Sequence, residues 1–149
     1  MVAFLAACSS ASPPEFNLSG AHVDATHWCP GGSVEARYDV HAMVQAHNNT
    51  TRDVTIQAAS AEMVLASVTG AWLEKVGDRY DAAAVKVSPA TVPARSTAAL
   101  DVAIPSACTS GRYGASQSSS GSYTVTINIA TNVGAFSVKA DNRHEILAA

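Results

Sequence analysis

Charged residues are scarce in this sequence of 149 residues, and their scarcity limits what the protein can bind. Lys and Arg together number 9, Asp and Glu number 12, and the formal net charge is −3. Nucleic-acid binding calls for a basic patch, which this composition does not favour. Long apolar runs are missing as well, since none reaches the roughly 18 residues of a membrane-spanning helix. With 48% hydrophobic residues, the chain can still fold around its own core.

Motifs typical of enzymes are missing too. Serines are abundant at 116–122, but no Gly-x-Ser-x-Gly nucleophile elbow occurs, and low complexity accounts for them. The acidic residues are scattered along the chain, so no pair of carboxylates points to acid–base catalysis. We therefore expect no enzyme activity, no cofactor and no small-molecule substrate.

Cysteine is rare, with three residues in the chain. Cys8 ends the run Leu5-Ala6-Ala7-Cys8, which resembles the lipobox at which bacterial signal peptides are cleaved and the cysteine is lipidated. The apolar stretch 2–7 is too short for a complete signal peptide, and a basic segment is missing. Residues 1–8 are predicted to be a truncated signal peptide with its lipidation site at Cys8. The alternative is an ordinary apolar N-terminus that contains a chance cysteine.

Lipidation at Cys8 predicts an extracytoplasmic location in a bacterial cell envelope, either the periplasm or the cell surface. Residues 9–14, Ser-Ser-Ala-Ser-Pro-Pro, are predicted to form a semi-rigid tether because they are small, polar and end in two prolines. Residues 15–149 are long enough for one domain with a core of its own. We expect protein partners in the envelope and contact with the membrane through the lipid alone.

Alternating apolar residues predict a chain built of strands. At 122–129, Tyr123, Val125, Ile127 and Ile129 fall on one face, and 33–47 alternates in the same way. Segment 61–76 fits either a helix or a strand, and we favour a strand at 63–69 followed by a loop containing Trp72. Pro105 is expected to end a strand at 97–104, and 27–32 is expected to be a turn. The other predicted strands are 16–25, 53–60, 82–87 and one that begins at Ala135.

Three runs resemble the last strands of immunoglobulin-like or fibronectin type III-like domains. They are Leu100-Asp-Val102-Ala-Ile104, Gly121-Ser-Tyr123-Thr-Val125 and Phe136-Ser-Val138. The resemblance implies an all-β protein, an immunoglobulin-like antiparallel β-sandwich of seven to eight strands. It also implies a tyrosine corner, in which the Tyr123 hydroxyl bonds to backbone upstream. Such domains commonly act as protein-interaction or scaffold modules, here as an accessory subunit of an envelope or membrane complex.

The cysteines depart from the antibody pattern. Val40 and Val125 stand near the positions where antibody domains carry their inter-sheet disulfide. In the implied topology, however, the turn holding Cys29 and the segment after Cys108 lie at the same end of the sandwich. A disulfide between Cys29 and Cys108 is therefore expected, with roughly 4–5 kcal/mol of stabilisation in the chain-entropy model. The alternative is two free thiols.

Two sets of residues are candidates for binding. The irregular segment after Cys108 carries Arg112 and Tyr113, residue types enriched at interface hot spots, at the end expected to face away from the tether. A solvated spacer loop is the alternative for this segment. His41, Met43 and His47 share one face of the strand at 33–47, and imidazole with thioether suits copper. A periplasmic copper-binding protein is the alternative function, although same-face neighbours on a strand stand about 7 Å apart.

Overall fold

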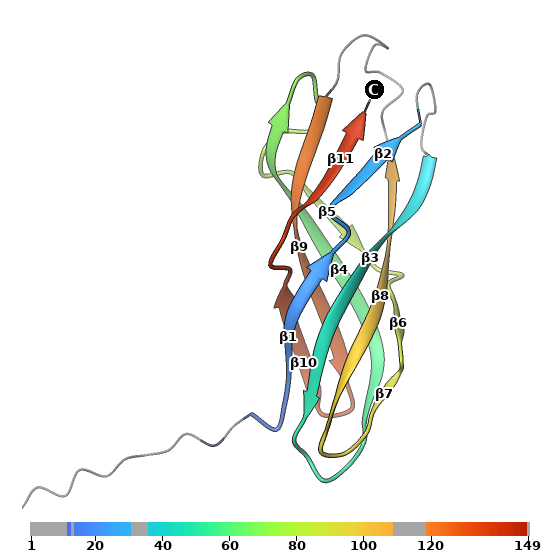
Figure 1. Ribbon diagram of the computed structural model, residues 1–149, viewed down its shortest axis with the longest axis vertical. Helices are drawn as coiled ribbons and strands as arrows, with labels where there is room; N and C mark the ends of the chain where they lie inside the picture. The colour runs from blue at the N-terminus through green and yellow to red at the C-terminus, as the bar shows by residue number, and fades with distance from the viewer. Residues whose placement is uncertain (1–11, 13, 31–35, 109–118, 149) are drawn as a thin grey trace, which may run out of the picture.

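The computed structural model describes residues 12, 14–30, 36–108 and 119–148, which form strands arranged in two layers (Figure 1). In the first sheet the strand order is β1 (Phe16–Val23), β3 (Ala36–Asn48), β8 (Ser96–Cys108) and β6 (Lys86–Ser88). In the second it is β2 (Thr26–Cys29), β11 (His144–Ala148), β9 (Ser119–Thr131), β4 (Val54–Thr69) and β5 (Arg79–Ala82). Two further strands complete this arrangement: β10 (Gly134–Lys139) pairs with β9, and β7 (Thr91–Val92) pairs with β4.

This strand order is that of an immunoglobulin-like sandwich. The first sheet follows the order A-B-E-D, and β10, β9 and β4 take the places of strands G, F and C. The chain changes layers early, because β1 belongs to the first sheet whereas β2 pairs in parallel with β11 in the second. The predicted fold class is confirmed.

The core lies between the sheets and follows the predicted alternation. Val40 and Val44 from β3 face inward, as do Val125 and Ile127 from β9, and all four are fully buried. Val40 and Val125 thus fill the middle of the sandwich with apolar side chains where an antibody domain would have a disulfide.

Several strand boundaries differ from the predictions. Thr26–Cys29 is strand β2 and not a turn. The expected strand at 82–87 divides into β5 and β6, which belong to different sheets. Pro105 does not end β8, which continues to Cys108. Strand β6 covers β8 only at 101–103, so Pro105 lies on an open edge, where its missing N–H removes no ladder bond.

The start of β1 and the end of β8, where the disulfide is formed, lie at opposite ends of the sandwich (Figure 1). Near the tether, the Asn49 amide donates to the Glu15 carbonyl at 2.8 Å, and the Asn49 side chain donates to the Pro14 carbonyl at 2.9 Å. The β9–β10 turn is at this same end. At the other end, hereafter the distal end, Ala36 pairs with Cys108 and Ala148 pairs with Cys29. The disulfide end is thus opposite the start of β1, as predicted, whereas the role of residues 9–14 as a tether stays a prediction.

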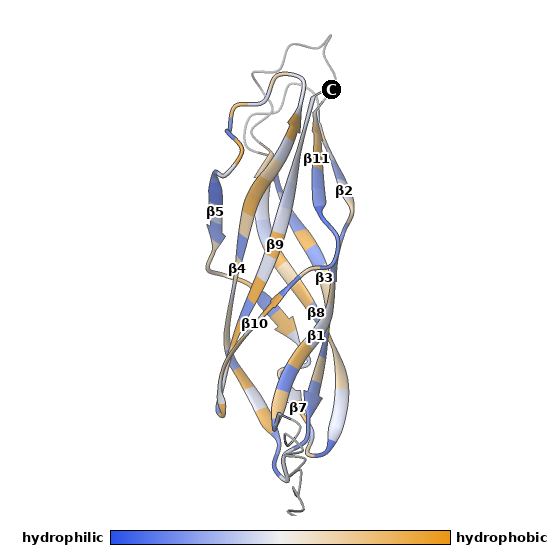
Figure 2. Cartoon of the chain, turned by 90° about the vertical axis from the view of Figure 1, so that its left-hand side faces the viewer, coloured by the Kyte–Doolittle hydropathy of each residue, from blue (hydrophilic) through white to orange (hydrophobic). Residues whose placement is uncertain are grey.

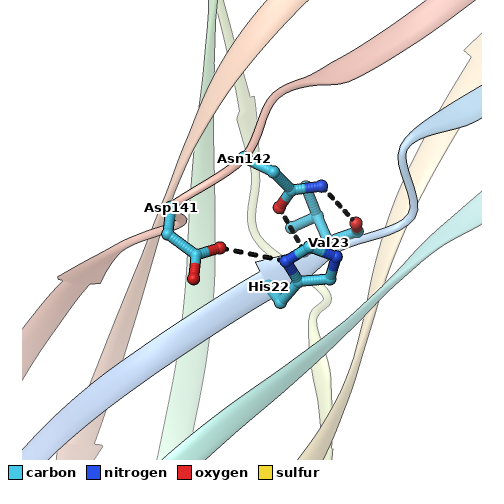
Figure 3. Close-up of polar contacts among 4 residues, drawn as sticks. All are labelled: His22, Val23, Asp141 and Asn142. Atoms are coloured by element: carbon cyan, nitrogen blue, oxygen red, sulfur yellow. Dashed lines mark hydrogen bonds and ion pairs between the residues drawn. The ribbon is translucent and has the colours of Figure 1, made fainter.

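One side chain secures the point where the chain changes layers (Figure 3). Asn142 lies between β10 and β11; its Oδ1 accepts from the Val23 amide at 2.9 Å, and its Nδ2 donates to the Val23 carbonyl at 2.8 Å. An amide side chain thus replaces a neighbouring strand at the last residue of β1. Beside it, His22 Nδ1 lies 3.0 Å from Asp141 Oδ1 on the surface.

Within the described ranges, no helix is long and apolar enough to cross a membrane.

Candidate functional site

A disulfide joins the two sheets at the distal end. Cys29 ends β2 in the second sheet, Cys108 ends β8 in the first, and their Cα atoms are 5.7 Å apart. Both cysteines are buried. The expected disulfide is present, and it links the end of β2 covalently to the end of β8 at the distal end.

The loop between β4 and β5, residues 70–78, is anchored to β9 by hydrogen bonds. Trp72 Nε1 donates to Tyr123 Oη at 3.1 Å and lies 3.3 Å from Glu74 Oε2. Tyr123 Oη in turn donates to Glu74 Oε2 in a short contact. The implied tyrosine corner is therefore wrong, because the Tyr123 hydroxyl bonds to loop side chains and not to upstream backbone. Burial, followed by the hydrogen bond to Glu74, raises the pKa of Tyr123 above its ordinary value.

Trp72 packs directly over Gly121 of β9. A Cβ atom added to Gly121 would stand 2.5 Å from Cε2 of the indole, closer than real Cβ atoms come to other heavy atoms. The Trp72 indole can therefore occupy this position only because residue 121 has no side chain. The prediction that Trp72 lies in a loop after a strand is confirmed, and 61–69 is strand throughout.

Exposed apolar side chains gather at the distal end. Leu73 and Val76 of the 70–78 loop are 51% and 61% exposed, and Trp28 of β2 is 64% exposed. Figure 2 shows that apolar and hydrophilic segments alternate along this loop above the hydrophilic strand β5. Aromatic anchors of this kind are common at the centres of protein interfaces, so this end is the candidate interaction surface.

A buried polar network lies beneath this surface. His144 is fully buried, and its Nδ1 lies 2.6 Å from the Asp24 carbonyl while its Nε2 lies 3.0 Å from Tyr38 Oη. Because a carbonyl can only accept, Nδ1 carries the proton and Tyr38 donates to Nε2. Burial lowers the pKa of His144 and raises that of Tyr38 to about 12. His27 stacks on Tyr38 with ring centroids 3.6 Å apart.

The alternative copper site is not assembled in the described residues. His41 and Met43 line an open groove of about 670 Å³ on the outer face of the first sheet. His47 does not line this groove, and its two ring nitrogens lie 2.9 Å from Ser19 Oγ and 3.0 Å from Thr97 Oγ1. No group of three His, Cys, Asp or Glu residues in the described part could hold a metal ion. The same-face spacing along β3 keeps these side chains apart.

Three other predicted site residues, Cys8, Arg112 and Tyr113, lie outside the described residues. The Trp72–Glu74–Tyr123 network and the buried His144 were not predicted from the sequence. Loop side chains carry no periodic pattern, and a histidine in the last strand looks like any surface histidine until its partners are known. For the Trp72–Glu74–Tyr123 network, the sequence signal was a tryptophan two residues before a glutamate in a short predicted loop.

Solved structures similar to this chain include three distant matches. The ASH/PapD-like domain 7 of human CEP192 is 12% identical, with 99% of this chain and 94% of that chain covered and a TM-score of 0.35. AggA, the major subunit of aggregative adherence fimbriae type I from Escherichia coli, is 9% identical, with 94% of this chain and 99% of that chain covered and a TM-score of 0.38. A GH20 exo-β-N-acetylglucosaminidase from Vibrio harveyi is 12% identical over 87% of this chain and 18% of that chain, with a TM-score of 0.24.

No protein-family model and no curated protein sequence matches the chain. The scores of the structural matches are too low to carry a functional argument. The immunoglobulin-like assignment rests on the strand order of the two sheets.

Proposed function

We propose that this chain is a protein-interaction module of a bacterial cell envelope, held by a lipid on Cys8 and meeting its partner with the distal end. The observation that carries the proposal is the separation of the two ends. The described end of the tether, Pro14, lies at one end of the sandwich, and the exposed Trp28 and Val76 belong to the other. A domain held at one end presents its opposite end most freely.

Distances along the chain support this arrangement. The six residues 9–14 reach at most about 20 Å when fully extended. Strand β9, with 13 residues, adds roughly 40 Å along the sandwich. The distal surface would therefore stand well clear of the lipid headgroups, where a second envelope protein can reach it.

Arg112 and Tyr113 belong to the same proposal. They lie in the connection between β8 and β9, and the described ends of this connection, Cys108 and Ser119, are both at the distal end. We assign them as further partner contacts beside Trp28 and Val76. A binding role also agrees with the expectation of no enzyme activity.

Anchoring is tested by Cys8→Ser in a chain expressed behind a complete signal peptide. Two acyl chains hold a protein stably at a membrane, whereas one holds it only marginally. The variant should move from the membrane fraction to the soluble fraction. Unchanged fractionation would remove the lipid from the proposal.

The interaction surface is tested by site-specific photo-crosslinking in intact cells. Val76 and Val133 are matched, because both are exposed valines, at 61% and 48%, and Val133 lies at the tether end. A photoreactive residue at 76 should give one dominant adduct, and the same residue at 133 should give none of that species. Equal adducts from both positions, or an adduct from 133 alone, would contradict the assignment of the distal end.

A further inference from the structure

A cavity of about 130 Å³ opens at the distal end between the two sheets. Three aromatic residues, one carboxylate and two aliphatic side chains account for most of its lining: Trp72, Tyr80, Tyr123, Glu74, Met63 and Ile146. Tyr80 is 43% exposed, and its hydroxyl donates to the Pro105 carbonyl of the facing sheet at 3.0 Å. The Tyr80 ring therefore bridges the two sheets beside the cavity and remains in contact with solvent.

Glu74 is the only charged residue among the described residues that line the cavity. Its Oε2 receives the neutral donors Trp72 Nε1 and Tyr123 Oη. No described Lys, Arg or His forms an ion pair with it. A half-buried carboxylate with no cation beside it favours a positively charged ligand and disfavours an anionic one.

We propose that this cavity binds an alkylammonium group, with Glu74 as its counter-ion and the rings of Trp72, Tyr80 and Tyr123 around its methylene or methyl groups. Aromatic faces attract ammonium groups through their quadrupoles, and aromatic cages recognise methylated and quaternary ammonium ions. The volume suits a head group with a short chain, since an engineered cavity of about 150 Å³ admits benzene. Met63 and Ile146 provide apolar contact for the chain.

Two sources could supply this group: a lysine side chain of a partner protein, or a free organic amine. The site does not depend on lipidation of Cys8, so it goes beyond the proposed function. Its failure would leave the fractionation and crosslinking results unaffected.

Binding is measured by NMR titration of the full chain with n-butylammonium chloride. The chain has two tryptophans, so it gives two indole N–H signals, which the Trp28→Phe variant assigns. The Trp72 signal should shift with saturation, and the Trp28 signal should not. n-Butanol, which has the same chain without the charge, should bind at least 10-fold more weakly.

Glu74→Gln keeps the shape and the acceptor oxygen but removes the charge, and it should weaken n-butylammonium binding at least 10-fold. Glu15→Gln is the matched control, because it removes the same charge from an exposed residue at the tether end. Tyr80→Leu, at a partly exposed position, should also weaken binding. Equal binding of n-butanol, or unchanged binding by Glu74→Gln, would overturn the proposal.

The source is resolved with two further probes. Tighter binding of the blocked peptide acetyl-Gly-Lys-Gly-amide than of n-butylammonium would assign the site to a partner's lysine. Tighter binding of tetramethylammonium would assign it to a free quaternary amine. Both outcomes require the Glu74 charge, and no detectable shift of Trp72 by any of the three cations would exclude the site.

Discussion

At Gly121, strand β9 passes beneath the indole of Trp72 with no room for a methyl group. Gly121→Ala should therefore push Trp72 and its loop away from β9. We expect the free energy of unfolding to fall by about 1–3 kcal/mol, the usual cost of overpacking, in urea denaturation. The double variant Gly121→Ala/Trp72→Ala relieves the clash, so it should lose less stability than the sum of the two single variants. Strict additivity would show that Trp72 does not rest on Gly121 in solution.

His144 should make the stability of the protein depend on pH. Its pKa is lower in the folded state than the ordinary value of 6.5, so the unfolded state binds the proton more tightly. Full stability is expected above about pH 6.5, and the free energy of unfolding should fall as the pH drops below it, by at most about 1.4 kcal/mol per pH unit. Urea denaturation between about pH 5 and pH 8 measures this dependence of the free energy of unfolding on pH. This range extends roughly 1.5 pH units to either side of the ordinary histidine pKa.

The control is His144→Gln, which cannot be protonated in this range and keeps polar atoms near the Asp24 carbonyl and Tyr38 Oη. The variant should be less stable at neutral pH and should lose most of the pH dependence. An unchanged pH dependence would assign the effect to other groups.

Residue-level contacts were the least predictable part of this protein. Burial of Val125 and Ile127 follows from alternation along one strand, which is local information. The partners of Tyr123 are Trp72 and Glu74, 51 and 49 residues away, and their meeting depends on where a loop without periodicity folds back. The same holds for His144, whose partner Asp24 is 120 residues away.

The Asn142 side chain is hydrogen-bonded to the Val23 backbone where the chain passes from β1 to β2 (Figure 3). Asn142→Ala would leave the amide and the carbonyl of the buried residue Val23 without these partners. An unsatisfied buried polar group costs about 1–3 kcal/mol, so the free energy of unfolding should fall by that order. Amide hydrogen exchange at Val23 should become faster as well.

The neighbouring Asp141→Ala is a matched control. The His22 and Asp141 side chains are 64% and 66% exposed, and exposed ion pairs contribute about 0–1 kcal/mol. Asp141→Ala should therefore change stability little and leave exchange at Val23 unaltered. Equal effects of the two variants would mean that the 140–143 turn acts only through its backbone.

At the scale of elements, the sequence predicted long antiparallel strands well and short or irregular ones poorly. Strand β3 was found because buried residues alternate strictly with more exposed ones from Val40 to Asn48. Strand β2 was missed because it has four residues and pairs at the edge with β11. A bulge between Ile56 and Ala58 shifts the register of β4, and Ala58 is exposed although it lies two residues after Ile56 in the same strand.

For the whole molecule, the Cys29–Cys108 bridge should be the largest single contribution to stability. It closes a loop of 79 residue steps, and the chain-entropy model assigns about 4–5 kcal/mol to a loop of that length. The double variant Cys29→Ala/Cys108→Ala should lose stability of this order in urea denaturation without reductant. Peptide mapping without reductant should recover the cross-linked pair; free, alkylatable thiols would contradict it.

The position of this bridge also determines how the protein responds to mechanical force. A membrane tether and a partner at the distal end would pull along the strands, so the bonds between β1 and β3 would be loaded together in shear. Once the sheets separate, the disulfide still holds the segment between Cys29 and Cys108 as a closed loop. Those 79 residue steps correspond to roughly 270 Å of extended chain. In single-molecule pulling, reductant should lengthen the unfolding step by that amount, so the intact bridge would keep a loaded domain short and able to refold.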